Sequence, residues 1–224
     1  MDVRLVELEI SEEQRMRRVV SRSNYRVTGK YPSWKKQRMA YWESSIELDG
    51  FRRLDADPSV FGYQEQPAKI TYEVDGKRHV HYPDILIDQA GRRVFREVKT
   101  DDDAASSEVV TRTEVMKMLL APRGFGYRVW PESEIRKQPQ LDNEIYLLQY
   151  GRSATCVFTL ERLRRLFELE PIISWDTLVH TVLTPQGLFP ACRLVLEGCL
   201  LIDHDLPLSP QTAVRFNFAK GNQA

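Results

Sequence analysis

The sequence predicts an α/β protein with two domains. Residues 1–150 are expected to form a mixed sheet flanked by helices, and residues 151–224 a small helical domain with a β-ribbon. The chain has 224 residues, a length that suits one large domain or two small ones. Alternating strand patterns dominate residues 60–99, helical patterns lie on both sides of them, and short helices prevail after Gly151. We therefore place the domain boundary at residue 150.

The composition is that of a soluble globular protein, with 42% hydrophobic and 29% charged residues. No apolar run approaches the roughly 20 residues that cross a bilayer, and the N-terminal residues lack the apolar stretch of a signal peptide. Cys156, Cys192 and Cys199 lack the close spacing of a zinc site. We therefore expect reduced thiols in a cytosolic protein.

Positive charge gathers between Gln14 and Trp42, although the net charge of the chain is zero. No acidic residue interrupts this segment, and Tyr25, Tyr31 and Trp34 lie between its basic residues. Such a segment favours contact with a polyanion such as nucleic acid, while a solvated face followed by a loop is the alternative. Its basic residues are Arg15, Arg17, Arg18, Arg22, Arg26, Lys30, Lys35, Lys36 and Arg38.

Two helices are expected before the strands. Residues 9–20 can form the first, with Ser11 as a candidate cap. The second is expected over residues 34–48, where apolar residues recur at spacings of three and four and form one stripe. Glu43 would lie beside that stripe on the second helix.

The next elements are expected to form an antiparallel meander. Asp75-Gly76 follows an alternating strand and is a strong signal for a two-residue hairpin turn. Pro83 indicates a bend, and Ala90-Gly91 a further turn. The expected strands cover residues 60–64, 68–74, 77–81, 84–88 and 93–99.

Helices and one strand complete the first domain. An amphipathic helix is expected over residues 106–120, a buried strand over 127–130, a short helix from Pro131 and a helix over 143–150.

The second domain is expected to hold three short helices and then two strands. The helices cover residues 159–169, 174–183 and 188–196, and the strands 198–203 and 212–218. This order is the outline of a winged-helix domain. The third helix holds Arg193 as its only basic residue, so binding to protein is as well supported as binding to DNA.

The pattern that carries chemistry is Pro83-Asp84, twelve intervening residues, and Glu97-Val98-Lys99. The turn at residue 91 brings Asp84 back beside Glu97, and Glu97 and Lys99 share one face of their strand. Two carboxylates can hold Mg²⁺, which activates water, and Lys99 could orient that water or offset charge on a phosphate. The Val98 carbonyl and Glu43 are further candidate ligands. The set suits phosphodiester hydrolysis, although Glu-x-Lys alone is a common strand sequence.

Other polar residues have ordinary interpretations. His79 and His81 could bind Zn²⁺, but we expect them to face solvent or DNA. Residues 101–103, all aspartates, are expected to cap the next helix, with a second metal site as the alternative. His180 is expected to be partly buried on an apolar helix face, and the tryptophans near the N-terminus to pack in the core.

These residues resemble a known family. The pattern of a helix bearing Glu43, then Pro83-Asp84 and Glu-x-Lys, resembles the restriction-endonuclease-like nucleases. The stretches VTGKYPSWKKQRMAYWESSIELD, FGYQEQPAKITYEVDGKRHVHYPDILID and FREVKT resemble TnsA, the endonuclease subunit of heteromeric transposases. This resemblance covers residues 24–101, and the domain expected after Gly151 agrees with the second domain that such proteins carry.

The resemblance implies a Mg²⁺-dependent DNA endonuclease of the bacterial cytoplasm, for which Mn²⁺ is a substitute. It would cut the 5′ strands at transposon ends in double-stranded DNA, together with a DDE-class transposase and an AAA+ regulator ATPase. The alternatives are a stand-alone restriction or repair-type endonuclease, and a DNA-binding assembly module with a degenerate nuclease core.

The resemblance also implies roles for single residues. Glu43, Asp84 and Lys99 correspond to catalytic residues, and Glu97 stands where some members have glutamine. The candidate catalytic residues are therefore Glu43, Asp84, Glu97 and Lys99, and the candidate metal ligands are Glu43, Asp84, Glu97 and Val98. Gln66 is a candidate for orienting water or phosphate. The candidate DNA contacts are Lys30, Lys35, Lys36, Arg38 and Gln66.

Overall fold

The structure is a computed structural model, which describes residues 2–11, 16 and 28–221. It divides into two compact units, the first Met1–Leu54 with Ser59–Arg136, and the second Asp55–Pro58 with Lys137–Ala224. The expected boundary after residue 150 would have placed helix α5 (Gln140–Tyr150) in the first unit. Instead α5 packs on helix α8 (Leu188–Leu196) of the second unit, which shifts the boundary toward the N-terminus.

A four-stranded sheet forms the centre of the first unit, in the order β4-β7-β8-β9. Strands β4 (Val60–Glu65), β7 (Ile85–Gln89) and β8 (Arg92–Lys99) are antiparallel neighbours, whereas β9 (Phe125–Pro131) runs parallel to β8. A parallel neighbour requires a crossover connection, which helix α3 (Ser107–Leu120) provides. The mixed sheet agrees with the sequence-based prediction.

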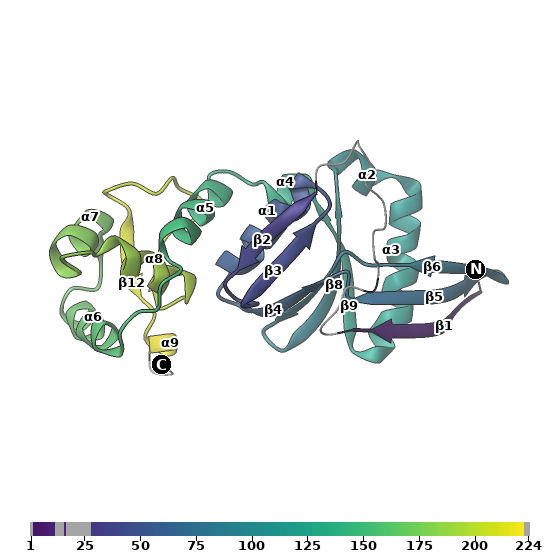
Figure 1. The fold of residues 1–224 in the computed structure, drawn as a ribbon, viewed down its shortest axis with the longest axis horizontal. Coiled ribbons are helices and arrows are strands. Elements are labelled where there is room, and N and C mark those ends of the chain that lie inside the picture. The colour runs from purple at the N-terminus through teal and green to yellow at the C-terminus, as the bar shows by residue number, and fades with distance from the viewer. Residues whose placement is uncertain (1, 12–15, 17–27, 222–224) are drawn as a thin grey trace. The chain divides into compact units, whose positions relative to one another are not determined.

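Helices cover both faces of this sheet (Figure 1). Side chains of one strand alternate between the two faces, so Ile87 and Val98 pack toward helix α1 (Ser45–Ala56), while Leu86 and Phe95 pack toward α3. The core on the α1 side is Tyr31, Ala40, Phe51, Leu54, Val60, Tyr63, Ile85, Ile87, Val98, Trp130 and Ile135. The core on the α3 side is Ala68, Ile70, Tyr72, Leu86, Phe95, Val115, Met116, Leu119, Leu120 and Tyr127.

The expected meander is divided between two sheets. Strands β5 (Ala68–Val74) and β6 (Lys77–His81) form the predicted hairpin, and Asp75 and Gly76 both have the positive φ that this turn needs. Strand β1 (Val3–Ile10) pairs with β5 and completes a separate three-stranded sheet. The chain then leaves that sheet around Pro83 and enters β7 of the central sheet.

The helix predicted over residues 9–20 is wrong at its start, because Glu9 and Ile10 pair with β5 as the end of β1. The rest of that helix lies mostly outside the described residues, as do Arg15, Arg17, Arg18, Arg22 and Arg26.

The helix predicted over residues 34–48 is also wrong. Strand β2 (Gly29–Ser33) pairs with strand β3 (Arg38–Trp42), and α1 begins only at Ser45. In β3 the side chain of Ala40 is buried while Met39 is 48% exposed, which is the period of two of a strand. The apparent helical stripe arose because its members come from two elements, β3 and α1. Trp42 is partly buried against the core on the α1 side, as expected.

Short helices connect β8 to α3 and follow β9. Helix α2 (Asp101–Ala105) begins after Thr100, whose hydroxyl accepts a hydrogen bond from the Asp103 backbone N–H. The predicted helix after it is confirmed as α3, with Ser106 as its cap. A 3₁₀ turn, η1 (Ala121–Arg123), precedes β9, and helix α4 (Glu132–Ile135) follows it. The three aspartates 101–103 thus lie in the first turn of α2, where the helix dipole favours negative charge.

The second unit holds counterparts of the three helices and two strands predicted for it, and also elements that were not predicted there. Its elements are helix α5, helix α6 (Val157–Leu169), strand β10 (Ile173–Ser174), helix α7 (Trp175–Thr177) with the π-helical turn η2 (Leu178–Val182), helix α8, strands β11 (Leu200–Leu201) and β12 (Ala213–Phe216), and helix α9 (Phe218–Gly221). Of these, β10 and α9 were not predicted. The strands form one sheet in the order β10-β12-β11. Ser174 caps α7, because its hydroxyl accepts a hydrogen bond from the backbone N–H of Thr177.

The helix predicted over residues 159–169 begins two residues earlier, at Val157. The prediction that His180 is partly buried is wrong, since its side chain is 72% exposed on η2. Within the described ranges, no helix combines the length and apolar character needed to cross a membrane.

Candidate functional site

An open pocket of about 650 Å³ lies in the first unit, where the end of β8 and the start of β7 meet the start of α1. Glu43, Asp84 and Lys99 all line it, so three of the four predicted catalytic residues share one pocket, and the predicted ligand Val98 lines it as well. The fourth, Glu97, is not among the lining residues. Further polar residues of the wall are Ser44, Ser45, Glu47, Gln66, Tyr82, Thr100 and Asp103.

Asp84 is held at the pocket by the pairing of β7 with β8. Its Oδ2 accepts a hydrogen bond of 2.8 Å from the backbone N–H of Val98. Burial raises the pKa of Asp84 to about 7, and the negative charges of Glu47 and Glu97 add to this, while Lys99 and the Val98 N–H oppose it. The site therefore holds a carboxyl that is costly to ionise unless a cation comes close to it.

Glu43 does not lie on a helix, contrary to prediction, but two residues before α1. The Ser44 hydroxyl accepts from the backbone N–H of Glu47 at 3.1 Å, and the Glu47 carboxylate accepts from the backbone N–H of Glu43 at 2.8 Å. This reciprocal pair resembles the capping boxes found at helix starts. It fixes the backbone of Glu43 at the pocket.

Gln66 joins Glu43 to Asp84. Its side-chain amide donates a hydrogen bond of 2.6 Å to Glu43 Oε1, and its backbone N–H donates to the Asp84 carbonyl at 2.7 Å. Its φ of 43° lies in the left-handed region, a conformation that costs a residue with a side chain about 1–3 kcal/mol. Its Oε1 is buried and has no hydrogen-bond partner among the residues that the structure describes.

Lys99 and Glu97 point to the same face of β8, as the strand pattern predicted. Lys99 Nζ lies 3.1 Å from Glu97 Oε1. The side chain of Lys99 is 27% exposed and lines the pocket, whereas Glu97 is only 4% exposed. Lys99 therefore extends from a buried carboxylate to the pocket.

Glu97 is surrounded by hydrogen-bond donors. Arg112 on α3 donates to Oε1 at 2.7 Å, and the hydroxyl of Tyr127 on β9 donates to Oε2. His81 Nε2 lies 3.2 Å from the same Oε2. Burial raises the pKa of Glu97, but the contacts with His81, Lys99 and Tyr127 outweigh it and hold that pKa well below its usual range. Glu97 is therefore a buried, ionised carboxylate.

The two histidines of β6 have different surroundings. The prediction that His81 faces solvent or DNA is wrong, since its side chain is 11% exposed and also lies 2.9 Å from the Tyr127 hydroxyl. His79 is exposed and stacks on Tyr72, with ring centroids 5.3 Å apart.

Sequence reasoning did not single out Arg112, Tyr127 or Glu47. Arg112 and Tyr127 lie on α3 and β9, away from the motif in sequence, and no local pattern links them to Glu97. The Ser44-x-x-Glu47 spacing is a recognisable capping signal, and it could have placed the helix start after Glu43.

Two of the predicted DNA contacts make ion pairs inside the first unit. Lys36 pairs with Glu65, and Arg38 donates two hydrogen bonds to the same carboxylate at 2.8 and 3.2 Å. Arg38 also donates to the Gln64 amide oxygen at 2.8 Å. Because Glu65 is buried, these cations compensate a charge that would otherwise be unpaired.

The other two predicted DNA contacts, Lys35 and Lys30, have different surroundings. Lys35 Nζ donates a 2.8 Å hydrogen bond to the Leu54 carbonyl. Lys30 is exposed on β2, and its ammonium lies 5.3 Å from the centre of the Tyr41 ring. Contact of these lysines with DNA stays a prediction.

The pocket fits a hard cation that keeps part of its water. Among the described residues, no three carboxylate, imidazole or thiolate side chains are close enough to hold a metal by themselves. The donors present are oxygens, among them the Asp84 carboxyl with its raised pKa and the buried Oε1 of Gln66, which has no partner within the described ranges. Mg²⁺ commonly takes one or two carboxylates and completes its shell with water and substrate. Asp84 and Gln66 could thus hold Mg²⁺ if water or substrate completes its coordination shell.

Comparison with known families gives one match to this unit. Residues 57–132 match a family model described as TnsA-like endonuclease N terminal. The matched range includes Asp84, Glu97 and Lys99, whereas Glu43 precedes it. No curated protein matches the sequence.

Proposed function

We propose that the protein is a metal-dependent DNA endonuclease, because residues 57–132 match the model of the TnsA-like endonuclease N-terminal domain. In this proposal it cuts the 5′ strands at transposon ends as one subunit of a heteromeric transposase. The observation that carries the proposal is the meeting of Glu43, Asp84 and Lys99 at one pocket of the first unit.

The residues of the pocket have separate roles in this proposal. Asp84 and the Val98 carbonyl would hold Mg²⁺ or Mn²⁺, with Gln66 and Glu43 as further oxygen donors. Such an ion, when bound, lowers the pKa of water and stabilises negative charge on a phosphate. The Lys99 ammonium binds a non-bridging phosphate oxygen and offsets the charge that develops there. Gln66 holds the Glu43 carboxylate toward the pocket through its 2.6 Å hydrogen bond.

The second unit has a partner-binding role in this proposal. Its order is one helix, a short strand, two helical segments and two further strands, running from α6 to β12. We propose that this is a winged-helix domain, because three helical segments and a three-stranded sheet in that order are typical of the fold. The partners of the whole protein would be transposon-end DNA, a DDE-class transposase that acts on the 3′ ends, and an AAA+ regulator ATPase.

Cleavage of labelled transposon-end DNA by the protein with its DDE partner tests the proposal. Asp84→Ala and Lys99→Ala should each lower 5′-strand cutting at least about 100-fold, the loss usual when a charge-stabilising group is removed. Asp88→Ala, which alters an exposed carboxylate on the same strand β7, is the matched control and should cut normally. Normal cutting by Asp84→Ala or Lys99→Ala would show that the assignment is wrong.

A calorimetric titration with Mg²⁺ or Mn²⁺ separates this function from an assembly module with a degenerate core. The proposal expects the wild-type protein to bind the metal with end DNA present. If no metal binds under these conditions, the carboxylates are structural and the module is the better description.

A further inference from the structure

Glu97 occupies the position of a metal ligand in the sequence motif, yet its surroundings differ from those of a ligand. It is 4% exposed and does not line the pocket that Asp84 and Lys99 share. Its carboxylate lies beside Lys99 Nζ, on the face of β8 that is covered by α3. A ligand would need an oxygen directed into the pocket.

Both oxygens of Glu97 already have partners. Oε1 accepts from Arg112 at 2.7 Å and lies 3.1 Å from Lys99 Nζ. Oε2 accepts from the Tyr127 hydroxyl and lies 3.2 Å from His81 Nε2. An ionised carboxylate offers about four lone-pair sites, and four donor groups surround this one. A metal could bind Glu97 only by displacing a buried partner.

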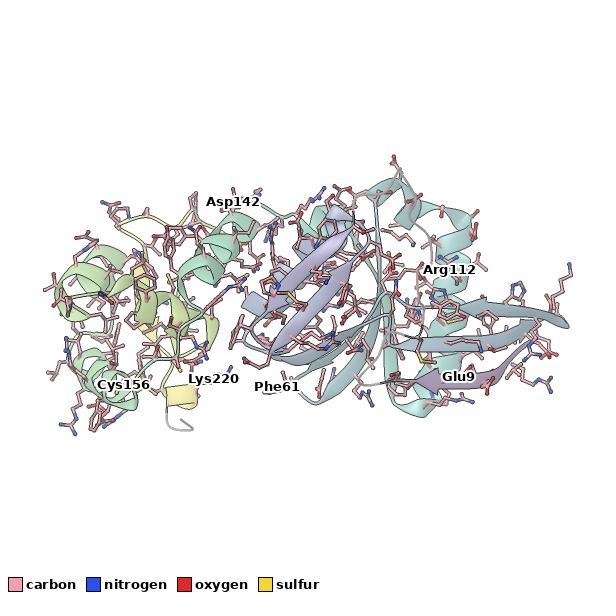
Figure 2. The ribbon with its side chains drawn as sticks, viewed as in Figure 1. Glu9, Phe61, Arg112, Asp142, Cys156 and Lys220 are labelled. Carbon is pink, nitrogen blue, oxygen red and sulfur yellow. The ribbon has the colours of Figure 1, made fainter. Side chains whose placement is uncertain are left out.

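Arg112 changes what Lys99 can do. If Lys99 were the only cation beside the buried Glu97 carboxylate, its ammonium would be held there to balance the negative charge. With Arg112, labelled in Figure 2, contributing a second cation from α3, the ammonium of Lys99 is no longer the only compensation. An ammonium has three N–H donors, and Glu97 Oε1 takes one of them. The remaining donors can face the pocket that Lys99 lines.

We propose that Glu97 is a positioning residue for Lys99 and not a metal ligand, and that Arg112 and Tyr127 complete this buried anchor. The flexible four-carbon side chain of lysine has no preferred direction of its own, so a fixed anion beneath it determines where the ammonium lies. This inference rests on the proposed function, because it gives Lys99 a phosphate to bind.

Glu97→Gln separates the two roles, because it removes the charge and keeps the shape. Mn²⁺ is titrated calorimetrically into each protein bound to a non-cleavable end duplex, and single-turnover cutting is measured at saturating Mg²⁺. A positioning role predicts Mn²⁺ affinity within about threefold of wild type and a cutting rate lowered about 10–100-fold, the usual effect of losing a residue that orients a site. Asp84→Asn is the positive control and should lose Mn²⁺ affinity.

Two results would overturn the proposal. Mn²⁺ affinity lowered tenfold or more in Glu97→Gln, with cutting restored at high metal, would make Glu97 a ligand. Unchanged cutting per folded molecule, with the folded fraction taken from thermal unfolding, would make it a purely structural residue.

Arg112→Lys tests the same anchor from α3 and covers the case in which Glu97→Gln does not fold. It keeps a cation near Oε1 but loses the planar fork of arginine. The expected result is again normal Mn²⁺ affinity with slower cutting, and a greater loss in Arg112→Met. If both Arg112 variants cut at the wild-type rate, the proposal that Arg112 helps to position Lys99 would be contradicted. If the wild-type protein binds Mn²⁺ but never cuts, the proposed function fails and the inference falls with it.

Discussion

Asp84→Asn should stabilise the metal-free protein at alkaline pH, although it removes a residue of the proposed site. Burial raises the pKa of Asp84 to about 7, so above that pH the folded protein holds a carboxylate that water would solvate better in the unfolded chain. Asparagine keeps an oxygen that can accept the hydrogen bond of the Val98 N–H. The variant therefore loses the cost of ionisation and keeps the local geometry.

The size of the effect follows from the two pKa values. Asp84 has an ordinary pKa of 3.8 and a folded pKa of about 7. The folded pKa is the higher of the two. The stability that protonated Asp84 contributes is therefore fully present below the unfolded pKa, and it is lost as the pH rises through the folded pKa. At about 1.4 kcal/mol per pH unit, the loss is about 2 kcal/mol at pH 5 and about 4 kcal/mol at pH 8. The advantage of Asp84→Asn should therefore grow by about 2–3 kcal/mol between these pH values.

Urea unfolding in EDTA at pH 5, 6, 7 and 8 measures this difference. Trp130 is buried in the first unit and reports on its unfolding by fluorescence. Asp88→Asn, at an exposed position of β7, is the control and should follow the wild-type protein at each pH. A difference between Asp84→Asn and wild type that stays constant within about 0.5 kcal/mol from pH 5 to pH 8 would refute the reasoning. Adding Mg²⁺ at pH 8 should stabilise the wild-type protein and not the variant.

Two further substitutions test the residues that hold Glu43. Ser44→Ala removes the hydroxyl that caps α1, and should lower the free energy of unfolding by about 1 kcal/mol and slow cutting, measured by urea unfolding and DNA cleavage; unchanged stability would contradict the capping role. Gln66→Gly relieves the positive φ and should raise stability by up to about 1 kcal/mol, while cutting falls because Glu43 loses its amide donor. Lower stability in Gln66→Gly would show that the lost side-chain hydrogen bond and packing outweigh the relief of φ.

The sequence could predict the features that depend on neighbouring residues. The Asp75-Gly76 turn and the shared face of Glu97 and Lys99 follow from two-residue rules, and the structure confirms both. The position of Glu43 outside the helix could not be predicted from such rules, because the five residues of β3 are too few to show a clear alternation before α1 begins. The capping hydrogen bond of Ser44 determines that boundary.

The surroundings of Glu97 could not be predicted for a different reason. Its partners Arg112 and Tyr127 come from α3 and β9, and they reach the carboxylate only because β9 pairs in parallel with β8. That pairing depends on how the crossover packs on the sheet, which no pattern within the motif reports. A motif of three residues can therefore identify the pocket without identifying which member faces it.

The parallel crossover between β8 and β9 also sets when a working site can exist during synthesis of the chain. Strand β8 cannot bury the Glu97 carboxylate until α3 and β9 have supplied Arg112 and Tyr127, because an unpaired buried charge costs several kcal/mol. A nascent chain released up to Lys99 already contains Glu43, Gln66, Asp84 and Lys99, yet it lacks the parts that fix Lys99 in place. The capacity to cut DNA would thus appear late in folding, once the polypeptide has passed residue 127.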